Sequence, residues 1–233
     1  MQTLSIIIPT RRLDDAVLRR MEQARRLLPA DEIVVVEPED IGADAAAPQS
    51  ARPGLTLVRA RRGRGSQCAA GARAVRGNLL MFLHDDTELP DGAWAAINQG
   101  FEDPEVVMTC FRLRFDQRHW LLSLYGWFSR FETIWTTFGD QAMVVRRSAL
   151  EAVGGMPDWP LFEDVEIARR LRRQGRTIKL PLAVTTSAVR YRANGVIGQQ
   201  LRNALRMLRF LLGESPERLA RAYEAQPGGR DRR

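Results

Sequence analysis

Short apolar runs alternate with helical patterns through the first 83 residues, and this alternation limits the folds open to the chain. Buried strands are expected at four such runs, namely 4–9, 32–37, 55–58 and 78–83. Helices are expected from Asp14 to Pro29 and over 67–75, the second with Ser66 as its N-cap. Residues 38–54 have no clean period and predict a loop. This order predicts an α/β protein whose doubly wound, mostly parallel sheet carries helices on both faces.

The rest of the chain continues with strands and C-terminal helices. Strands are expected at 106–115 and 141–145. Helices are expected at 120–138, 147–153, 163–174 and 196–212, with one more from Pro216 onward. Because no internal repeat or linker interrupts these patterns, residues 1–222 are predicted to form a single domain. Residues 223–233 are predicted to form a disordered tail.

Arginine dominates the charge of the chain. Its 233 residues carry a net charge of +7, the pI is about 10.5, and Lys179 is the single lysine. Such a surface favours anionic partners such as phosphates and acidic lipid headgroups, although a general preference for arginine in the source genome would give the same bias. No nucleic-acid reader motif accompanies the charge, so nucleic acid is not expected as a partner. Cys68 and Cys110 lack metal-ligand spacing and are expected to be buried.

The sequence predicts a cytoplasmic protein. Its first residues lack the apolar length and the cleavage site of a signal peptide, and no run of 18 apolar residues predicts a spanning helix. Residues 120–138 and 196–212 are rich in large apolar side chains, which leaves open core packing, a homodimer interface, a groove for an apolar acceptor, or peripheral contact with the inner membrane face. In the last case Arg202, Arg206 and Arg209, which share one helix face, would meet anionic headgroups.

One stretch joins a Gly/Arg-rich loop, GRGSQ, to a small-residue helix and then to an apolar strand that ends in HDDT. Ligands of open α/β sheets bind outside the carboxyl ends of the strands. Asp85 and Asp86 are therefore candidates for a divalent cation, and a simple turn after the strand is the alternative. Arg62 and Arg64, beside glycines, suit a phosphate group. His84 could be a ligand, a substrate contact or a buried hydrogen-bonded residue.

A second group of polar residues lies nearer the C-terminus. Glu163 and Asp164 follow a loop, 154–161, that contains two prolines and Trp159. Carboxylates in the first turn of a helix often serve only the helix dipole, but this loop could also hold them over a pocket. Asp140, between a glycine and a glutamine, is either a turn residue or an acceptor ligand.

Five segments in one order resemble glycosyltransferase family 2, which has the GT-A fold. The segments read IIIPT, VVVE, RGRGSQCAAGARAVRG, LLMFLHDDTELP and GDQAMVVRRSALEAVGGMPDWPLFEDVEIARRLRRQGR. The chain is similar in particular to a short bacterial subgroup with a His-X-Asp-Thr version of the metal motif. The resemblance covers roughly residues 3–222 and implies transfer of a sugar from a nucleoside-diphosphate sugar to an unknown hydroxyl acceptor.

The resemblance also implies roles for individual residues. Asp86 matches the principal metal ligand, for Mg²⁺ or Mn²⁺, while His84 and Asp85 match the first and middle positions of the motif. Asp164 matches the general base, with Glu163 beside it. A single base and direct displacement imply an inverting reaction. The remaining positions are assigned to the donor (Pro9, Thr10, Glu37, Arg62, Arg64, Asp85) and to the acceptor (Asp140, Gln141, Trp159).

The chain departs from the family pattern at two places in the expected nucleotide pocket. RRL replaces an Asn-Glu pair after Thr10, and EPED replaces an Asp-rich motif after the second strand. Glu37 would take the place of the aspartate that contacts the base, and Pro38 removes a backbone donor. The main hypothesis is an inverting, metal-dependent glycosyltransferase. The alternative is a glycosyltransferase-like binding protein with weakened catalysis.

Overall fold

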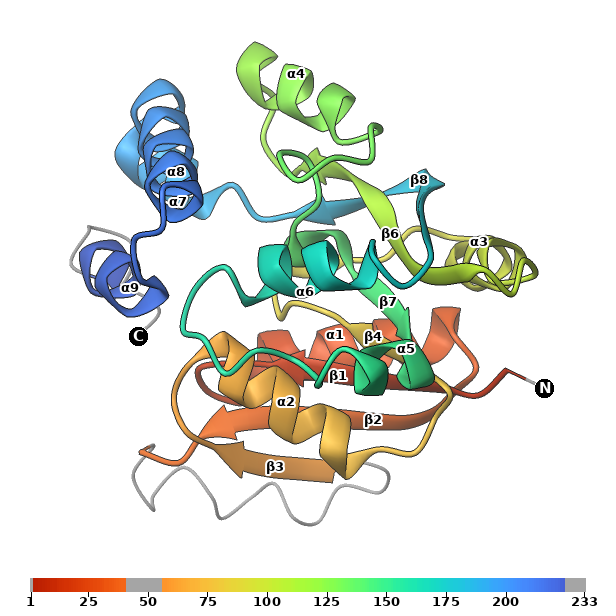
Figure 1. Ribbon diagram of the computed structural model, residues 1–233. Helices are drawn as coiled ribbons and strands as arrows, with labels where there is room; N and C mark the ends of the chain where they lie inside the picture. Colours follow the sequence, from red (N-terminus) through yellow and green to blue (C-terminus); the bar gives the residue numbers. More distant parts are fainter. Residues whose placement is uncertain (1, 41–55, 225–233) are drawn as a thin grey trace.

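The computed structural model describes residues 2–40 and 56–224, and its centre is a mixed sheet of eight strands in the order β3-β2-β1-β4-β7-β6-β8-β5 (Figure 1). The strands are β1 (Leu4–Pro9), β2 (Ala30–Pro38), β3 (Thr56–Ala60), β4 (Leu79–Phe82), β5 (Thr87–Glu88), β6 (Val106–Phe115), β7 (Met143–Arg146) and β8 (Arg176–Thr186). Strands β1 to β4 pair in parallel, as do β6 and β8. Strand β7 runs antiparallel to both of its neighbours, and β5 runs antiparallel to β8.

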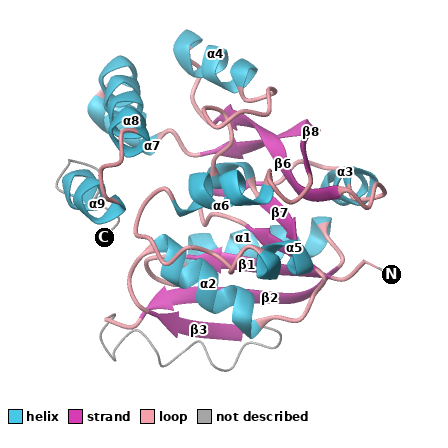
Figure 2. Ribbon diagram, in the orientation of Figure 1, coloured by secondary structure: helices cyan, strands magenta, loops and turns pink. Residues whose placement is uncertain are grey.

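Helices cover both faces of this sheet, as the sequence predicts (Figure 2). They are α1 (Asp15–Leu27), α2 (Arg64–Ala74), α3 (Ala93–Gly100), α4 (Trp120–Phe128), α5 (Arg147–Ala152), α6 (Glu163–Leu171), α7 (Val189–Asn194), α8 (Val196–Leu211) and α9 (Pro216–Glu224). Helices α1 and α3 contribute to the apolar core on one face, and α2, α5 and α6 to the core on the other. In β1, Ile6 and Ile8 enter the first core while Ile7 enters the second, which explains why the whole strand is apolar.

Strands β5 and β8 and helices α3 and α7 were not predicted from the sequence, and the two strands extend the sheet beyond β6. Strand β8 contains Lys179 and Pro181, which break the apolar run that marks a buried strand. Its pairing with β6 shifts register between Cys110 and Arg112, so the proline lies at an irregularity of the ladder. Helix α3 packs Ala93, Ala96 and Ile97 into the core, but its eight residues give too short a pattern to recognise.

The prediction of one helix over 120–138 is wrong, because α4 ends at Phe128. The hydroxyl of Ser129 donates to the carbonyl of Gly126 and accepts from the amide of Leu113 on β6. Further along, the hydroxyl of Thr136 donates to the carbonyl of Phe131. Such side-chain bonds to the backbone compete with helical hydrogen bonding. They stop the helix although the aromatic residues keep helical spacing.

The prediction that Ser66 caps the second helix is also wrong. Helix α2 begins three residues earlier than predicted, at Arg64 with Gly63 at the N-cap, and the Ser66 hydroxyl bonds Asp158 in the loop before α6. Part of the predicted 38–54 loop, and residues 225–233 of the predicted tail, lie outside the described residues. Helix α9 includes residues 223 and 224. Among the described helices, none combines the length and apolarity that crossing a bilayer requires.

Gly65 allows α2 to approach the 157–159 loop. Its amide donates to the carbonyl of Trp159 over 3.0 Å, and an added Cβ would lie 2.2 Å from the carbonyl oxygen of Pro157. We expect Gly65→Ala to lower the free energy of unfolding by about 1–3 kcal/mol. Gly198→Ala in α8 is the matched control, since an added Cβ there would lie 3.6 Å from the Arg202 guanidinium, an ordinary van der Waals distance. It should raise stability by about 0.5–1 kcal/mol. Urea unfolding measures both, and equal effects would contradict the close approach.

Candidate active site

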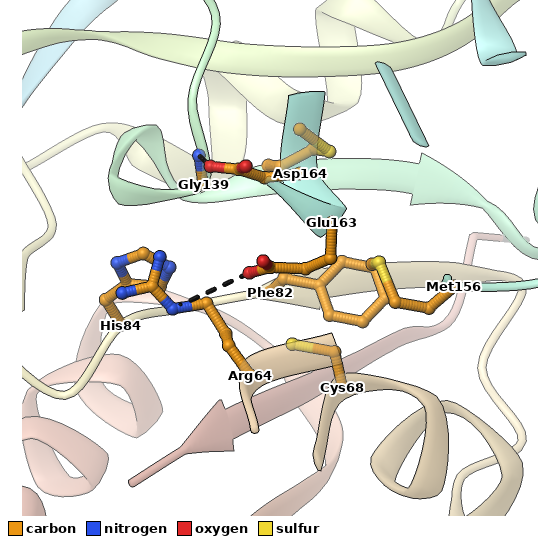
Figure 3. Close-up of a pocket in the computed structure, with 9 residues that line it drawn as sticks. Arg64, Cys68, Phe82, His84, Gly139, Met156, Glu163 and Asp164 are labelled. Atoms are coloured by element: carbon orange, nitrogen blue, oxygen red, sulfur yellow. Dashed lines mark hydrogen bonds and ion pairs between the residues drawn. The ribbon is translucent and has the colours of Figure 1, made fainter. Parts of the chain in front are cut away.

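A pocket lies where the carboxyl end of β4 meets the N-termini of α2 and α6 (Figure 3). Its lining residues come from these elements, from β7 and from the connecting loops: Arg64, Cys68, Phe82, His84, Gly139, Met143, Met156, Glu163 and Asp164. The structure therefore brings together residues that lie up to 100 positions apart in the sequence. The pocket is at the sheet edge where open α/β folds bind ligands.

Arg64 and Glu163 form the charged centre of the pocket. The Arg64 Nε atom lies 3.6 Å from Glu163 Oε1, too far for a hydrogen bond, and both buried carboxylate oxygens of Glu163 lack a hydrogen-bond partner. Burial, together with the negative charge of Asp164, raises the pKa of Glu163 to about 8 even though Arg64 opposes the shift. Burial also works against the charge on Arg64, but Glu163 and Asp164 outweigh it and raise the pKa of the guanidinium. Arg64 therefore stays charged while Glu163 is largely protonated at neutral pH.

Asp164 is held by two backbone amides. Its Oδ2 accepts from Gly139 over 2.6 Å, and its Oδ1 accepts from Val165 over 2.8 Å. A Cβ on Gly139 would lie 2.9 Å from His84 Nε2 and 3.2 Å from Asp164 Oδ2, so only glycine lets the chain pass between them. Phe162, the residue before α6, has a φ of 63°, which is rare for a non-glycine residue. Its ring stacks on Phe210 of α8 with centroids 4.7 Å apart.

The three residues of the expected metal motif differ in their surroundings. His84 is buried, and burial and the nearby Arg64 hold its pKa well below the usual range, so its imidazole is neutral. Asp85 accepts a hydrogen bond of 2.8 Å from the Thr10 hydroxyl at the end of β1. Asp86 lies close enough for its charge to act on Arg64, Asp140 and Arg190. Asp86 is thus the member of the motif most closely tied to the charged groups of the site.

Asp140 belongs to the same acidic group, whereas its neighbour Gln141 does not. Burial and the charges of Asp164 and Asp86 raise the pKa of Asp140 to about 7, and its buried Oδ1 has no hydrogen-bond partner. Gln141 is fully buried, donates to the carbonyl of Thr136 over 2.8 Å, and accepts from Lys179. Its side chain therefore holds the turn before β7 in place.

The residues that the sequence assigns to the donor differ in their surroundings. Thr10 and Pro9 lie buried at the end of β1, where Gln67 of α2 donates to the Thr10 carbonyl over 2.7 Å. Glu37 is fully buried, with one oxygen bonded to the amide of Leu13 and the other without a partner. Arg62 instead pairs with Asp40 over 2.8 Å on the exposed surface, outside the pocket lining.

Trp159, assigned to the acceptor from the sequence, lies in the loop that closes over α2. Its carbonyl accepts the Gly65 amide, and its ring meets Phe210 edge-on with centroids 6.1 Å apart. The loop is thus joined to α2 on one side and to α8 on the other. Trp159 is not among the residues that line the pocket.

Arg190 is the charged residue that sequence reasoning missed. Burial and the positive charges of Arg64 and Arg11 lower its pKa to about 10, which places the three guanidinium groups near one another. Its guanidinium lies 4.2 Å from the ring centroid of Tyr223, and that of Arg206 lies 4.9 Å from the same ring. No sequence pattern marks Arg190, because it reaches the site only through the path of the chain after β8. The buried position of Arg206 also corrects the expectation that it faces lipid headgroups.

The acidic residues fit a hard cation with few protein ligands. Within the residues that the structure describes, no three His, Cys, Asp or Glu side chains are placed to enclose a metal by themselves. Mg²⁺ and Mn²⁺ do not need such a cluster, since they keep waters and use one or two carboxylates with substrate phosphates. Asp86, whose charge acts on Arg64 and Asp140, provides an oxygen donor of this kind, and the neutral imidazole of His84, two residues before it, provides a nitrogen donor.

Solved structures similar to this chain are glycosyltransferases. The mannosyltransferase PcManGT from Pyrobaculum calidifontis, solved with GDP-Man and Mn²⁺, has a TM-score of 0.62 and 20% identity over 79% of this chain and 56% of its own. S. aureus TarS 1-349 has a TM-score of 0.59 and 15% identity over 80% of this chain and 60% of its own. GalNAc-T7, solved with UDP, GalNAc and Mn²⁺, has a TM-score of 0.61 and 13% identity over 80% of this chain and 44% of its own. The TM-scores establish a shared fold, the GT-A fold, and the chain spans less than two thirds of each neighbour.

A comparison with curated proteins gives no match. The family model described as "Glycosyltransferase like family 2" matches residues 2–206, which include every strand and the whole pocket. The chain therefore belongs to glycosyltransferase-like family 2.

Proposed function

We propose that the chain is an inverting glycosyltransferase that uses Mg²⁺ or Mn²⁺ to transfer a sugar from a nucleoside-diphosphate donor to a hydroxyl acceptor. The observation that carries the proposal is Asp164, fixed by the Gly139 amide beside a pocket that also holds Arg64. The family supports it, as do neighbours solved with GDP-Man, UDP-GlcNAc and Mn²⁺. The cytoplasmic location, the bacterial subgroup and a homodimer stay predictions.

Three arginines and a helix N-terminus favour a bound diphosphate. Arg64 is the first residue of α2, so its guanidinium and the positive end of the helix dipole act at one place. Arg190 and Arg11 add like charges that repel each other until an anion arrives. A divalent cation held at Asp86, with His84 as a second candidate ligand, would neutralise the leaving diphosphate.

Asp164 is the proposed general base. Its two amide partners orient the carboxylate and leave it free of ion pairs in the described contacts. The acceptor hydroxyl passes its proton to Asp164 as its oxygen forms the new bond to the anomeric carbon. The bond from that carbon to the diphosphate oxygen breaks on the opposite face, and the configuration inverts. Asp140 and Trp159 remain the proposed acceptor-side residues.

Glu163 has a different role in this proposal. Because it is largely protonated at neutral pH, it is a poor base and leaves most of the Arg64 charge available to a phosphate. It therefore acts as a neutral neighbour that positions Arg64. The alternative, a binding protein with weakened catalysis, is favoured by the RRL and EPED segments. Donor hydrolysis with added Mn²⁺ separates the two functions, since a binding protein releases no nucleotide.

Asp86→Asn should reduce sugar transfer to below about a tenth of the wild-type rate, because the amide cannot supply the negative charge that holds the cation. Asp85→Asn should reduce the transfer rate less, since the Asp85 carboxylate accepts a hydrogen bond from Thr10, which an asparagine oxygen can also accept. Asp91→Asn, an exposed carboxylate five residues further along, is the matched control. Transfer is measured as nucleotide release with an acceptor and Mn²⁺. Near wild-type activity in Asp86→Asn would contradict its assignment.

Asp164→Asn should lower turnover by about 10²–10⁴-fold, the usual contribution of a general base. The asparagine can still accept the Gly139 amide, so the fold and the affinity for the nucleotide should stay unchanged. Steady-state kinetics and nucleotide titration test the two parts separately. A large loss of nucleotide affinity with unchanged turnover would assign Asp164 to donor binding instead.

Glu163→Gln should stabilise the protein increasingly as the pH rises from about 5 to about 8. In this window the folded wild type keeps a proton, since the pKa of Glu163 is about 8 against an ordinary value of 4.5, and the unfolded chain has lost it. The wild-type free energy of unfolding therefore falls with pH, and glutamine removes this loss. Melting temperatures across the pH range test it, with exposed Glu102→Gln as the control. A difference that does not change with pH would contradict the raised pKa.

A further inference from the structure

The exposed large apolar side chains of the described residues gather in two segments, 120–135 and 189–212. Helices α4 and α8 provide most of them. The two helices contact each other and lie at the end of the molecule opposite β3 (Figure 1). An accumulation of this kind at one end of a protein marks an interaction surface.

Helix α8 has the reverse of the usual amphipathic arrangement. Leu201, Leu205 and Leu208 recur at helical spacing and are 67%, 55% and 47% exposed. The opposite face turns polar groups inward: buried Gln199 donates to Asn203 over 2.8 Å, and buried Arg206 donates to Asn203 over 3.1 Å. This polar face also contacts the neighbouring helices: Asn194 of α7 donates to Gln199 over 2.9 Å, Asn203 donates to the Tyr191 hydroxyl on α7 over 3.4 Å, and the Arg206 guanidinium lies 4.9 Å from the Tyr223 ring of α9. These contacts hold the polar face inward and leave the leucines outside.

Helix α4 presents aromatic residues in the same way. Trp120, Leu124 and Trp127 share one helical stripe and are exposed, while Leu122 on the other side is buried. Phe131 continues the stripe beyond the helix, with its ring 5.3 Å from that of Trp127. Tryptophan has an apolar ring and a polar N–H, which suits the boundary between lipid and water.

The charge around these side chains identifies the partner. Residues 117–131 and 187–213 contain seven arginines and no aspartate or glutamate. Arg192 and Arg209 pair with Asp116 and Glu214 at the ends of these segments, and Arg190 and Arg206 lie against Tyr223. The net positive charge of the surface therefore rests on the other three, Arg118, Arg130 and Arg202. Arg118 and Arg130 are exposed, and the Arg130 guanidinium lies 4.7 Å from the ring centroid of Trp127. A second copy docked face to face would oppose like charges, whereas anionic headgroups would neutralise them.

We propose that the exposed faces of α4 and α8 form a docking surface for an anionic lipid bilayer. The leucine and tryptophan side chains enter the boundary between headgroups and acyl chains, and the flanking arginines contact the headgroups. The surface goes beyond the proposed reaction and does not depend on it. It places α4 against the membrane, and the chain that follows α4 leads to Asp140 in the site.

Vesicle sedimentation tests the surface without donor or acceptor. Wild-type protein should bind vesicles of phosphatidylglycerol and phosphatidylcholine in equal parts, bind pure phosphatidylcholine much less, and dissociate as salt rises. Asp86→Asn should bind like the wild type, so a failed reaction mechanism and a failed docking surface give different results. Protein that stays in the supernatant at low salt, or binds both vesicles equally, would overturn the proposal.

Two variants locate the contact. Leu201→Gln/Leu205→Gln changes exposed residues and should lower the partition coefficient by about 10²-fold. Arg118→Glu/Arg130→Glu should lower it by about ten-fold or more, against Arg19→Glu/Arg26→Glu on α1 as the charge-matched control. Unchanged melting temperatures confirm folding. Full binding by the leucine variant would overturn the assignment. So would a wild-type dimer in sedimentation velocity that this variant abolishes while vesicle binding is absent.

Discussion

The hydrogen bond from the Gly139 amide to Asp164 is the contact on which the arrangement of the site depends. It joins the turn before β7 to the first turn of α6, so it fixes the carboxylate that we propose as the general base. The bond is possible because a glycine fits between Asp164 and His84, where a Cβ would be 2.9 Å from the imidazole. Buried Gln141 and half-buried Lys179 hold the same turn, since both donate to the carbonyl of Thr136. Much of the acidic group is therefore positioned by backbone contacts.

The sheet and the order of the site motifs could be predicted from the sequence, because their signals are local. Strands β1, β2 and β4 are buried on both faces and read as continuous apolar runs. The signals failed where a tertiary contact decides the outcome: Ser129 ends α4 by bonding β6, and Pro181 is tolerated in β8 at a register shift. Arg190 could not be found, since its place beside Arg64 depends on the folded path of the chain.

The two departures from the family pattern contact each other. Leu13, in the segment that replaces an Asn-Glu pair, donates its amide to Glu37, in the segment that replaces the Asp-rich motif. The longer glutamate side chain reaches the altered loop and satisfies a backbone donor there. The departures are therefore one coupled change in the local structure, and the second oxygen of Glu37 remains without a partner.

The polar face of α8 restricts which substitutions the helix can accept. Apolar contacts have no preferred direction, whereas hydrogen bonds do. The rotation of the helix about its own axis is thus set by the contacts of Gln199, Asn203 and Arg206 with α7 and α9, and the leucines on the outside need only stay apolar. Exchange among leucine, isoleucine, valine and phenylalanine on that side is close to neutral. Loss of the Asn203 amide would instead rotate or loosen the whole element. Three inward polar side chains thus restrict substitution more than the larger surface that they orient.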